Sequence, residues 1–270
     1  MKSLSVRGAE LHCIDCGQGR PMLFVHGFPL DHTMWAAEID ALSRQCRVIA
    51  PDLRGFGSSF VRRAGGTPTL PFTMEQFADD LAALLDALEI REPVVYCGLS
   101  MGGYIAFQFQ RKYAERLRGL VLCDTRSVAD TPEAATGRRR MAERVMKEGP
   151  GFVAETMLPR LFCEATRRQR PEMVEALRRV IMANSPQGIA AAALGMAERP
   201  DMTASLAEIR CPTLVIVGQE DAISPPTEMR GIAAAIPGAG FVEIPVAGHM
   251  APLENPAAVI AAIVEFLATL

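Results

Sequence analysis

A serine flanked by glycines at residues 98–102 has the residue types and spacing that best fit chemistry. The segment reads Gly-Leu-Ser-Met-Gly and follows an apolar run at 93–97. This pattern predicts a nucleophile elbow, a sharp turn from strand to helix that exposes the Ser100 hydroxyl. Glycines suit such a turn because its backbone segments approach too closely for larger side chains. A serine in an ordinary turn is the alternative, and the residues downstream favour the elbow.

A serine hydroxyl is a weak nucleophile at neutral pH, so Ser100 needs a base and a group that orients that base. The chain has four histidines. His249 follows the last strand-like run, at 241–244, and precedes the final helical segment. Since the nucleophile, acid and base of such enzymes follow one another in that chain order, we expect His249 to be the base.

Two aspartates compete for the role of the acid that orients the histidine. Asp221 lies in the short loop that follows the apolar run 213–217, and Asp124 comes directly after the run 120–123. Both lie at carboxyl ends of predicted strands, where the sites of α/β proteins assemble. Chain order favours Asp221, which would fix the imidazole tautomer and stabilise the imidazolium. Asp52 is predicted instead to hold the glycine-rich turn 52–58 through local backbone hydrogen bonds.

Acyl transfer also needs hydrogen-bond donors aimed at the developing oxyanion. The backbone N–H of Met101, next to the nucleophile, is one expected donor. The second is the N–H of Phe28, in the segment His-Gly-Phe-Pro that follows the apolar run 22–25. His26 is predicted to shape this loop through structural hydrogen bonds. Trp35, the only tryptophan, has two open interpretations, as a wall of the substrate pocket or as packing beneath the loop.

The elements that must position these residues alternate between short apolar runs and helical patterns. Thr73 and Gln76 form a capping box before one predicted helix, and Asn255 with Pro256 begins the last one. Alternation of this kind predicts a mostly parallel α/β sheet. The predicted strands are 22–25, 47–50, 94–97, 120–123, 213–217 and 241–244.

The alternation stops at 126–205, where helical stretches rich in Met, Ala and Arg replace the strands. We therefore predict a helical cap at 126–205, inserted into a core formed by 1–125 and 206–270. The cap has thirteen basic and ten acidic residues, a net charge of about +3. Its arginines could attract an anionic substrate, but a solvated helix face is the favoured interpretation. Its methionines are predicted to fill the core, with Met157 a candidate for a residue that contacts the substrate.

Composition limits the classes of function. The chain of 270 residues is 49% hydrophobic and carries a net charge of −3, which gives no electrostatic footprint for nucleic acid. It contains no apolar stretch of membrane-spanning length and no signal-peptide pattern at Met1, so we expect a cytoplasmic protein. The seven cysteines predict free thiols, and the single C-x-x-C at Cys13 and Cys16 lacks the second pair of a metal site. We expect no metal.

Together these segments resemble the α/β-hydrolase superfamily across nearly the whole chain. Residues 26–29 resemble its oxyanion loop, 98–103 its elbow, and 218–221 and 248–249 its acid and base loops. The segment 252–256, which follows the base loop, also resembles the family. The resemblance implies an eight-stranded, mostly parallel sheet, a lid over the site and no cofactor. Within the superfamily, the likeness is greatest to esterases, 3-oxoadipate enol-lactonases and cofactor-free haloperoxidases. A serine at position 100 differs from the aspartate of haloalkane dehalogenases and epoxide hydrolases, so their alkyl-enzyme chemistry is not expected.

The favoured hypothesis is a serine carboxylic-ester hydrolase for small to medium esters. An enol-lactonase that opens a small anionic lactone is the main alternative, and a perhydrolase of the haloperoxidase type is another. A non-catalytic receptor for a small molecule on the same fold is a hypothesis from a different class, disfavoured by the apparent triad. The oligomeric state is left open.

Overall fold

The computed structural model describes residues 1–61 and 71–270. Within these residues the chain forms one sheet of nine strands, with eight in the order β1-β2-β4-β3-β6-β7-β8-β9 and a short β5 that pairs with β2. The strands β3, β4 and β6 to β9 are parallel to one another, whereas β2 pairs antiparallel with β1, β4 and β5. The prediction of a mostly parallel sheet is confirmed. The strands are β1 Lys2–Val6, β2 Ala9–Cys16, β3 Arg20–Val25, β4 Cys46–Pro51, β5 Phe60–Val61, β6 Val94–Leu99, β7 Leu117–Cys123, β8 Thr213–Gly218 and β9 Gly240–Ile244.

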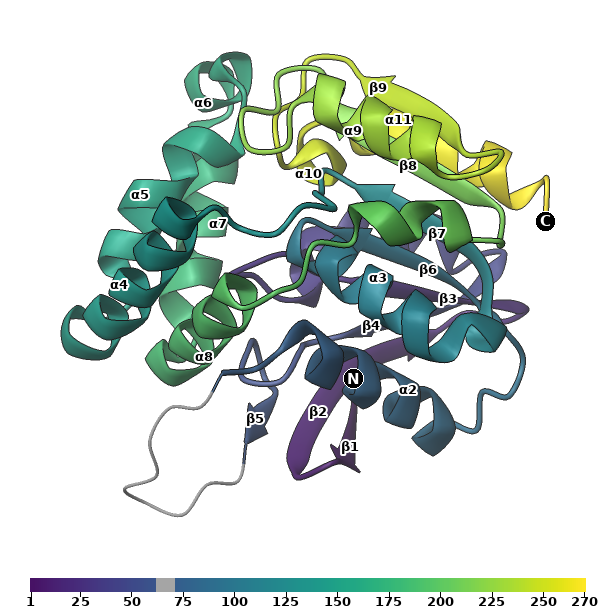
Figure 1. Ribbon diagram of the computed structural model, residues 1–270, viewed down its shortest axis with the longest axis horizontal. Helices are drawn as coiled ribbons and strands as arrows, with labels where there is room; N and C mark the ends of the chain where they lie inside the picture. Colours follow the sequence, from purple (N-terminus) through teal and green to yellow (C-terminus); the bar gives the residue numbers. More distant parts are fainter. Residues whose placement is uncertain (62–70) are drawn as a thin grey trace.

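The helices around the sheet begin where the sequence provides capping residues. Thr73 accepts a hydrogen bond from the N–H of Gln76 at 3.1 Å and starts α2, and Asn255 accepts from Ala258 and starts α11. Both predicted helix starts are confirmed. Helices α2 and α3 pack on each other in front of the sheet in Figure 1, and α1 packs against α11. Their bounds are α1 Ala36–Leu42, α2 Met74–Ala87, α3 Met101–Tyr113, α9 Pro226–Ala235, α10 Ala251–Glu254 and α11 Pro256–Leu267, with 3₁₀ turns at His32–Trp35, Ala114–Arg116 and Thr203–Glu208.

Five further helices fill the connection between β7 and β8, and we call them the cap. Figure 1 shows them beside the carboxyl ends of the strands. They occupy most of the segment in which strands were predicted to be absent, and α4 packs along α8. The cap helices are α4 Pro132–Glu148, α5 Gly151–Leu161, α6 Glu164–Gln169, α7 Pro171–Ala183 and α8 Pro186–Ala197.

The two chain segments that lead into and out of the cap are bound to each other. The Met202 N–H donates to the Ser127 carbonyl at 2.8 Å. Arg199, only 7% exposed, pairs with Asp130 at 2.7 Å and lies over the ring of Tyr104. The base of the cap is thus a polar junction on the core side.

The direction of the strand order changes between β3 and β6. From β3 the chain continues outward to β4, and from β6 it continues outward the other way through β7, β8 and β9. Sites in open α/β sheets form beyond the carboxyl ends of the strands at such a point. The loop after β3 and the turn after β6 therefore become neighbours, although about 70 residues separate them in sequence.

None of the described helices is long and apolar enough to cross a membrane. All seven cysteines have free thiols; five are buried, and Cys16 and Cys211 are half-buried.

Candidate active site

Ser100 occupies a strained backbone position at the junction of β6 and α3. Its φ of 54° and ψ of −110° lie in a region that residues with side chains rarely adopt, at a cost of about 1–3 kcal/mol. Its side chain makes no capping hydrogen bond to α3, although Ser100 is the N-cap residue. The half-buried hydroxyl is therefore not used in holding the helix.

Close packing around the turn explains the glycines of the elbow. A Cβ on Gly98 would lie 2.5 Å from the Gly102 carbonyl oxygen, and one on Gly102 would overlap the Val25 carbonyl of β3. Two side chains brace the same turn. The buried Tyr96 hydroxyl donates to the Gly102 carbonyl at 2.9 Å, and the Thr125 hydroxyl donates to the Ser100 carbonyl at 2.8 Å.

The two predicted oxyanion donors follow the carboxyl ends of β3 and β6, which are adjacent in the sheet. Met101 is the first residue of α3, where backbone N–H groups have no acceptor within the helix. Phe28 lies in the loop after β3, which we call the oxyanion loop, residues 26–32. Across 1–61 and 71–270, neither N–H has a hydrogen-bond acceptor. Their role as donors to an oxyanion remains a prediction.

His249 pairs with Asp221, which comes from a loop 28 residues earlier. The Nδ1 of His249 lies 2.8 Å from Oδ2 of Asp221, and both side chains are buried. The other carboxylate oxygen accepts hydrogen bonds from the N–H groups of Ile223 at 2.7 Å and Ser224 at 3.0 Å. Burial alone would raise the pKa of Asp221, but His249 and these donors together bring that pKa below its ordinary value.

Backbone hydrogen bonds hold the acid loop against the base loop. The N–H of Gln219 donates to the Ile244 carbonyl at 3.0 Å, and that of Glu220 donates to the Ala247 carbonyl at 2.9 Å. The distance between Asp221 and His249 is thus fixed by the backbone. The described residues show no hydrogen bond between the Ser100 hydroxyl and His249; such catalytic bonds often tighten only when substrate binds.

Asp124, the competing acid, is completely buried and does not contact the histidine through a hydrogen bond. Its Oδ1 accepts from the Gly218 N–H at 2.8 Å, whereas its Oδ2 has no partner in the described part of the chain. Burial and the nearby charge of Asp221 raise the pKa of Asp124 well above its ordinary value. A raised pKa and the lack of a hydrogen bond to His249 both make Asp124 less suited than Asp221 to orient the imidazole.

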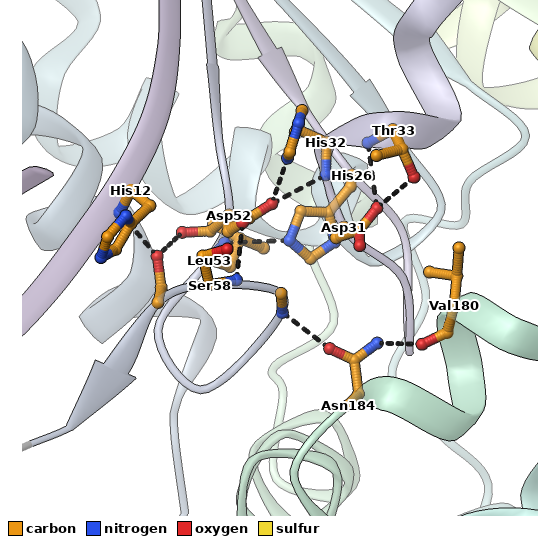
Figure 2. Close-up of polar contacts among 12 residues, drawn as sticks. His12, His26, Asp31, His32, Thr33, Asp52, Leu53, Ser58, Val180 and Asn184 are labelled. Atoms are coloured by element: carbon orange, nitrogen blue, oxygen red, sulfur yellow. Dashed lines mark hydrogen bonds and ion pairs between the residues drawn. The ribbon is translucent and has the colours of Figure 1, made fainter. Parts of the chain in front are cut away.

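Histidines in the oxyanion loop have structural partners, as Figure 2 shows. His26 is buried; its Nδ1 donates to the Gly27 carbonyl at 2.8 Å and its Nε2 accepts from the Leu53 N–H at 2.9 Å. His32 bonds to Asp52 at 2.6 Å, and the other oxygen of Asp52 accepts from the Ser58 N–H at 2.8 Å. These contacts fit the predicted structural roles of His26 and Asp52.

Asp31, His32 and Asp52 form the one group in the described segments with the spacing of metal ligands, within 4.8 Å of one another. Its members already have other partners. Asp31 accepts from the N–H of Thr33 and caps a 3₁₀ turn, and the hydrogen bond to Asp52 raises the pKa of His32. An ion pair between His32 and Asp52 accounts for this cluster.

Of the two interpretations of Trp35, the structure favours packing beneath the loop over a wall of the substrate pocket. The Trp35 side chain has no exposed surface and packs on the ring of Phe24, with the centroids 5.1 Å apart. The 3₁₀ turn thus buries the indole against β3. Met157 is half-buried on α5, where its contact with substrate remains a prediction.

Most of the cap arginines singled out by charge lie on exposed helix faces. Arg138 pairs with the buried Asp130, and Arg170 donates to the Thr166 hydroxyl at 2.9 Å. This arrangement fits the solvated-face interpretation. The exposed ones are Arg139, Arg140, Arg167 and Arg168.

Comparison with known proteins agrees with this fold. A family model described as alpha/beta hydrolase fold matches residues 20–256. The chain belongs to the α/β-hydrolase family. The structure of a thermophilic esterase from Thermogutta terrifontis, solved with malate bound, is 53% identical over 100% of this chain and 99% of its own, with a TM-score of 0.95.

Two enol-lactonases are also similar to this α/β-hydrolase. The structure of the enol-lactonase from Burkholderia xenovorans LB400 is 30% identical over 99% of this chain and 100% of its own, with a TM-score of 0.90. The 3-oxoadipate enol-lactonase 2 of Acinetobacter baylyi is 29% identical over 95% of this chain and 92% of its own. The predicted superfamily and fold class are confirmed, and the chain is an α/β-hydrolase enzyme.

The sequence analysis did not identify two residues, Glu254 and Asn184, that form hydrogen bonds to the loops of the candidate site. Glu254 accepts from the Gly248 N–H at 2.7 Å and from the Cys163 N–H at 2.9 Å, joining the histidine loop to the cap. Asn184 of the cap bonds to the oxyanion loop. Glu254 belongs to the segment 252–256 that resembles the family, which was a signal; Asn184 carried none.

Proposed function

We propose that this protein is a serine carboxylic-ester hydrolase that acts through an acyl-enzyme on small to medium esters. The observation that carries the proposal is the strained Ser100, with its hydroxyl uncommitted, on a sheet whose neighbouring loops hold the buried pair of His249 and Asp221. Strain of this kind is retained at sites where function requires it.

The proposed reaction has two halves. The Ser100 Oγ attacks the ester carbonyl carbon while Nε2 of His249 takes the hydroxyl proton, and Asp221 stabilises the imidazolium. The N–H groups of Phe28 and Met101 bind the oxyanion of the tetrahedral intermediate. The intermediate collapses, and the imidazolium gives its proton to the departing alcohol. Water then attacks the acyl-enzyme by the same route, releasing the carboxylic acid and restoring Ser100.

The similar esterase and enol-lactonases support a reaction at an ester bond. The esterase from Thermogutta terrifontis shares 53% of its residues with this chain, and the similar enol-lactonases open a cyclic ester. Hydrolysis of an ester bond is common to both groups. The preference for small to medium acyclic esters is the finer part of the proposal.

Enol-lactonase activity is the second candidate. It is favoured by the similarity to enol-lactonases along nearly the full chain and by the small dicarboxylate, malate, bound to the similar esterase. An anionic lactone needs a fixed cation in the site. The exposed cap arginines and the ion pair of Arg138 do not supply one, so the neutral ester ranks first.

The Ser100→Ala variant tests the proposal. We expect it to fold with an unchanged melting temperature, because the Ser100 hydroxyl makes no capping hydrogen bond and alanine keeps the same Cβ. Its turnover of p-nitrophenyl acetate should fall by on the order of 10³-fold or more. A fluorophosphonate probe should label the parent and not the variant.

The matched control is Ser3→Ala, at an exposed serine of β1. It should retain both turnover and labelling. Labelling that persists in Ser100→Ala would remove Ser100 from the role of nucleophile. A parent protein that binds esters without sustained turnover would favour the receptor hypothesis.

A further inference from the structure

Asn184 connects the cap to two loops of the core. It lies between α7 and α8, is 3% exposed and uses every polar atom of its amide. Its Nδ2 donates to the Pro29 carbonyl at 2.9 Å and to the Val180 carbonyl at 3.1 Å, and its Oδ1 accepts from the Gly57 N–H at 2.7 Å. Figure 2 shows Asn184 reaching from the cap helix toward these loops.

The partners of Asn184 fix the orientation of its amide. Two carbonyl oxygens face one end and an N–H group faces the other, so neither a flipped amide nor a carboxylate would satisfy all three. A buried carbonyl left without a donor costs free energy. The side chain is therefore held in one position between the oxyanion loop and the turn at Gly57.

The contact at Pro29 lies one residue after the proposed oxyanion donor Phe28. At its far end the oxyanion loop is held by His32 on Asp52, and at its near end by His26 on the Leu53 N–H. Both of those anchors belong to the core. Between these two contacts, Asn184 of the cap bonds to the Pro29 carbonyl, next to the residue that carries the Phe28 N–H.

The packing next to Asn184 shows that the cap and core meet closely there. A Cβ placed on Gly188 of α8 would overlap the Gly55 carbonyl oxygen, so two backbone segments are in contact. The Asn184 side chain bonds to Gly57 in the same turn and to Pro29 in the oxyanion loop. A shift of the cap at this point would therefore move the oxyanion loop as well.

We propose that Asn184 is a positioning residue that sets the Phe28 N–H for oxyanion binding, so that the cap completes the catalytic site as well as covering it. This inference rests on the proposed function. Asn184 touches no reacting atom; it acts through the Pro29 carbonyl. Because an oxyanion donor acts mainly in the transition state, its misplacement lowers kcat and leaves KM little changed.

The test compares Asn184→Leu and Asn184→Asp with the parent, using p-nitrophenyl acetate. Active sites are titrated with a fluorophosphonate, so that kcat refers to competent molecules only. We expect Asn184→Leu to lower kcat by about tenfold to a hundredfold, with KM within about twofold. The affinity for a boronic acid, which forms a tetrahedral adduct, should fall by a similar factor.

Asn184→Asp keeps the size of the side chain and covers the case in which the leucine variant does not fold. When its carboxyl is neutral it can still donate to Pro29, and when ionised it cannot. The ratio of its kcat to that of the parent should therefore fall as the pH rises. The control is Ser185→Ala, which removes the side-chain N-cap of α8. In the described residues, the Ser185 side chain makes no hydrogen bond to the oxyanion loop. Ser185→Ala should lower the melting temperature and leave kcat unchanged.

Four results would count against the inference. A kcat per active site in Asn184→Leu equal to that of the parent, or a ratio for Asn184→Asp near one at every pH, would overturn it while the proposed function stands. An equal loss of kcat in Ser185→Ala would show a general effect of cap stability instead. A parent without turnover would overturn the proposed function and this inference with it.

Discussion

At the scale of single residues, two buried carboxyl groups have pKa values that shift in opposite directions. Asp221 has the imidazole and two backbone donors around it, whereas Asp124 has one backbone donor and, in the described residues, an unpartnered oxygen. The partners of Asp221 lower its pKa against the effect of burial, and burial raises that of Asp124. Opposite environments thus separate the pKa values of the two carboxyl groups.

This difference predicts the ranking of two matched variants. Asp221→Asn should lower kcat on the order of 10³ to 10⁴-fold, because the amide favours the wrong imidazole tautomer and carries no charge. Asp124→Asn keeps the shape of a side chain that makes no hydrogen bond to His249, so kcat should stay within about tenfold. Steady-state kinetics on a p-nitrophenyl ester checks the ranking. The reverse order would assign the acid to position 124.

Glu38 is a buried carboxyl outside the site. It lies on α1 with no exposed surface, and neither of its oxygens has a partner in the described residues. Burial raises its pKa from 4.5 to about 8. In the unfolded chain the group ionises near the ordinary value. Folding must therefore keep it neutral at pH values where the unfolded chain has already lost the proton.

Glu38→Gln should reveal this linkage as a stability that depends on pH. Below about pH 4.5 both states of the parent hold the proton and the group carries no penalty. Between pH 4.5 and about 8 only the folded state holds it, so parent stability falls relative to the variant; above about 8 the difference levels off. Melting temperatures measured from pH 5 to 9 test this.

The control on the same helix is Asp40→Asn, whose side chain is 81% exposed. Its melting temperature relative to the parent should vary little over the same pH range. A constant difference between Glu38→Gln and the parent at all pH values would contradict a raised pKa in the folded state.

At the scale of elements, the loop that carries His249 is attached to the cap as well as to the sheet. Besides the two bonds of Glu254, the Met250 N–H donates to the Leu161 carbonyl at the end of α5, at 3.1 Å. Glu254 itself is buried on the short helix α10. The cap therefore contacts both loops that complete the proposed site. Glu254 joins it to the loop of His249, and Asn184 joins it to the oxyanion loop.

Glu254→Gln should weaken this attachment. One carboxylate oxygen becomes an NH₂ group that faces a backbone N–H, so one hydrogen bond to a charged acceptor is lost, at about 1.5–3 kcal/mol. We expect the free energy of unfolding in urea to fall by that amount, together with a lower kcat. Glu265→Gln, on an exposed position of α11, is the control and should change neither. Unchanged stability in Glu254→Gln would show that the bridge is dispensable.

At the scale of the whole molecule, charge is divided between the cap and the core. The cap carries about +3 and the remaining residues about −6. The described positive groups of the cap are largely solvated or paired, so the charge does not identify an anion site. The two candidate functions differ on this point, since a lactone with a free carboxylate needs a fixed cation and a neutral ester does not.

A pair of matched substrates separates the two. p-Nitrophenyl butyrate should have a higher kcat/KM than mono-p-nitrophenyl succinate, which has a similar chain length and a free carboxylate. A tenfold preference for the anionic ester, about 1.4 kcal/mol, would reverse our ranking in favour of the lactonase, provided that it disappears on replacement of a single cap arginine. The exposed Arg140→Gln is the control for a general effect of charge.

The sequence by itself determined the order of the candidate catalytic residues along the chain and most of the strands and helices that carry them. The predicted strands, the caps at Thr73 and Asn255 and the elbow at Ser100 depend on local causes: apolar runs, short side-chain hydrogen bonds and glycines that only a tight turn requires. Signals of this kind lie within a few residues of the element that they specify. For that reason they could be recognised in the sequence.

Only the tertiary structure decided which residues meet across distance. The burial of Trp35, the raised pKa of Asp124 and the bridges made by Asn184 and Glu254 all depend on segments far apart in the chain. Asn184 lies 155 residues from the carbonyl that it binds, and nothing in its local sequence differs from an ordinary helix end. Long-range packing sets the partners and the dielectric environment of each polar group, and these in turn set its role.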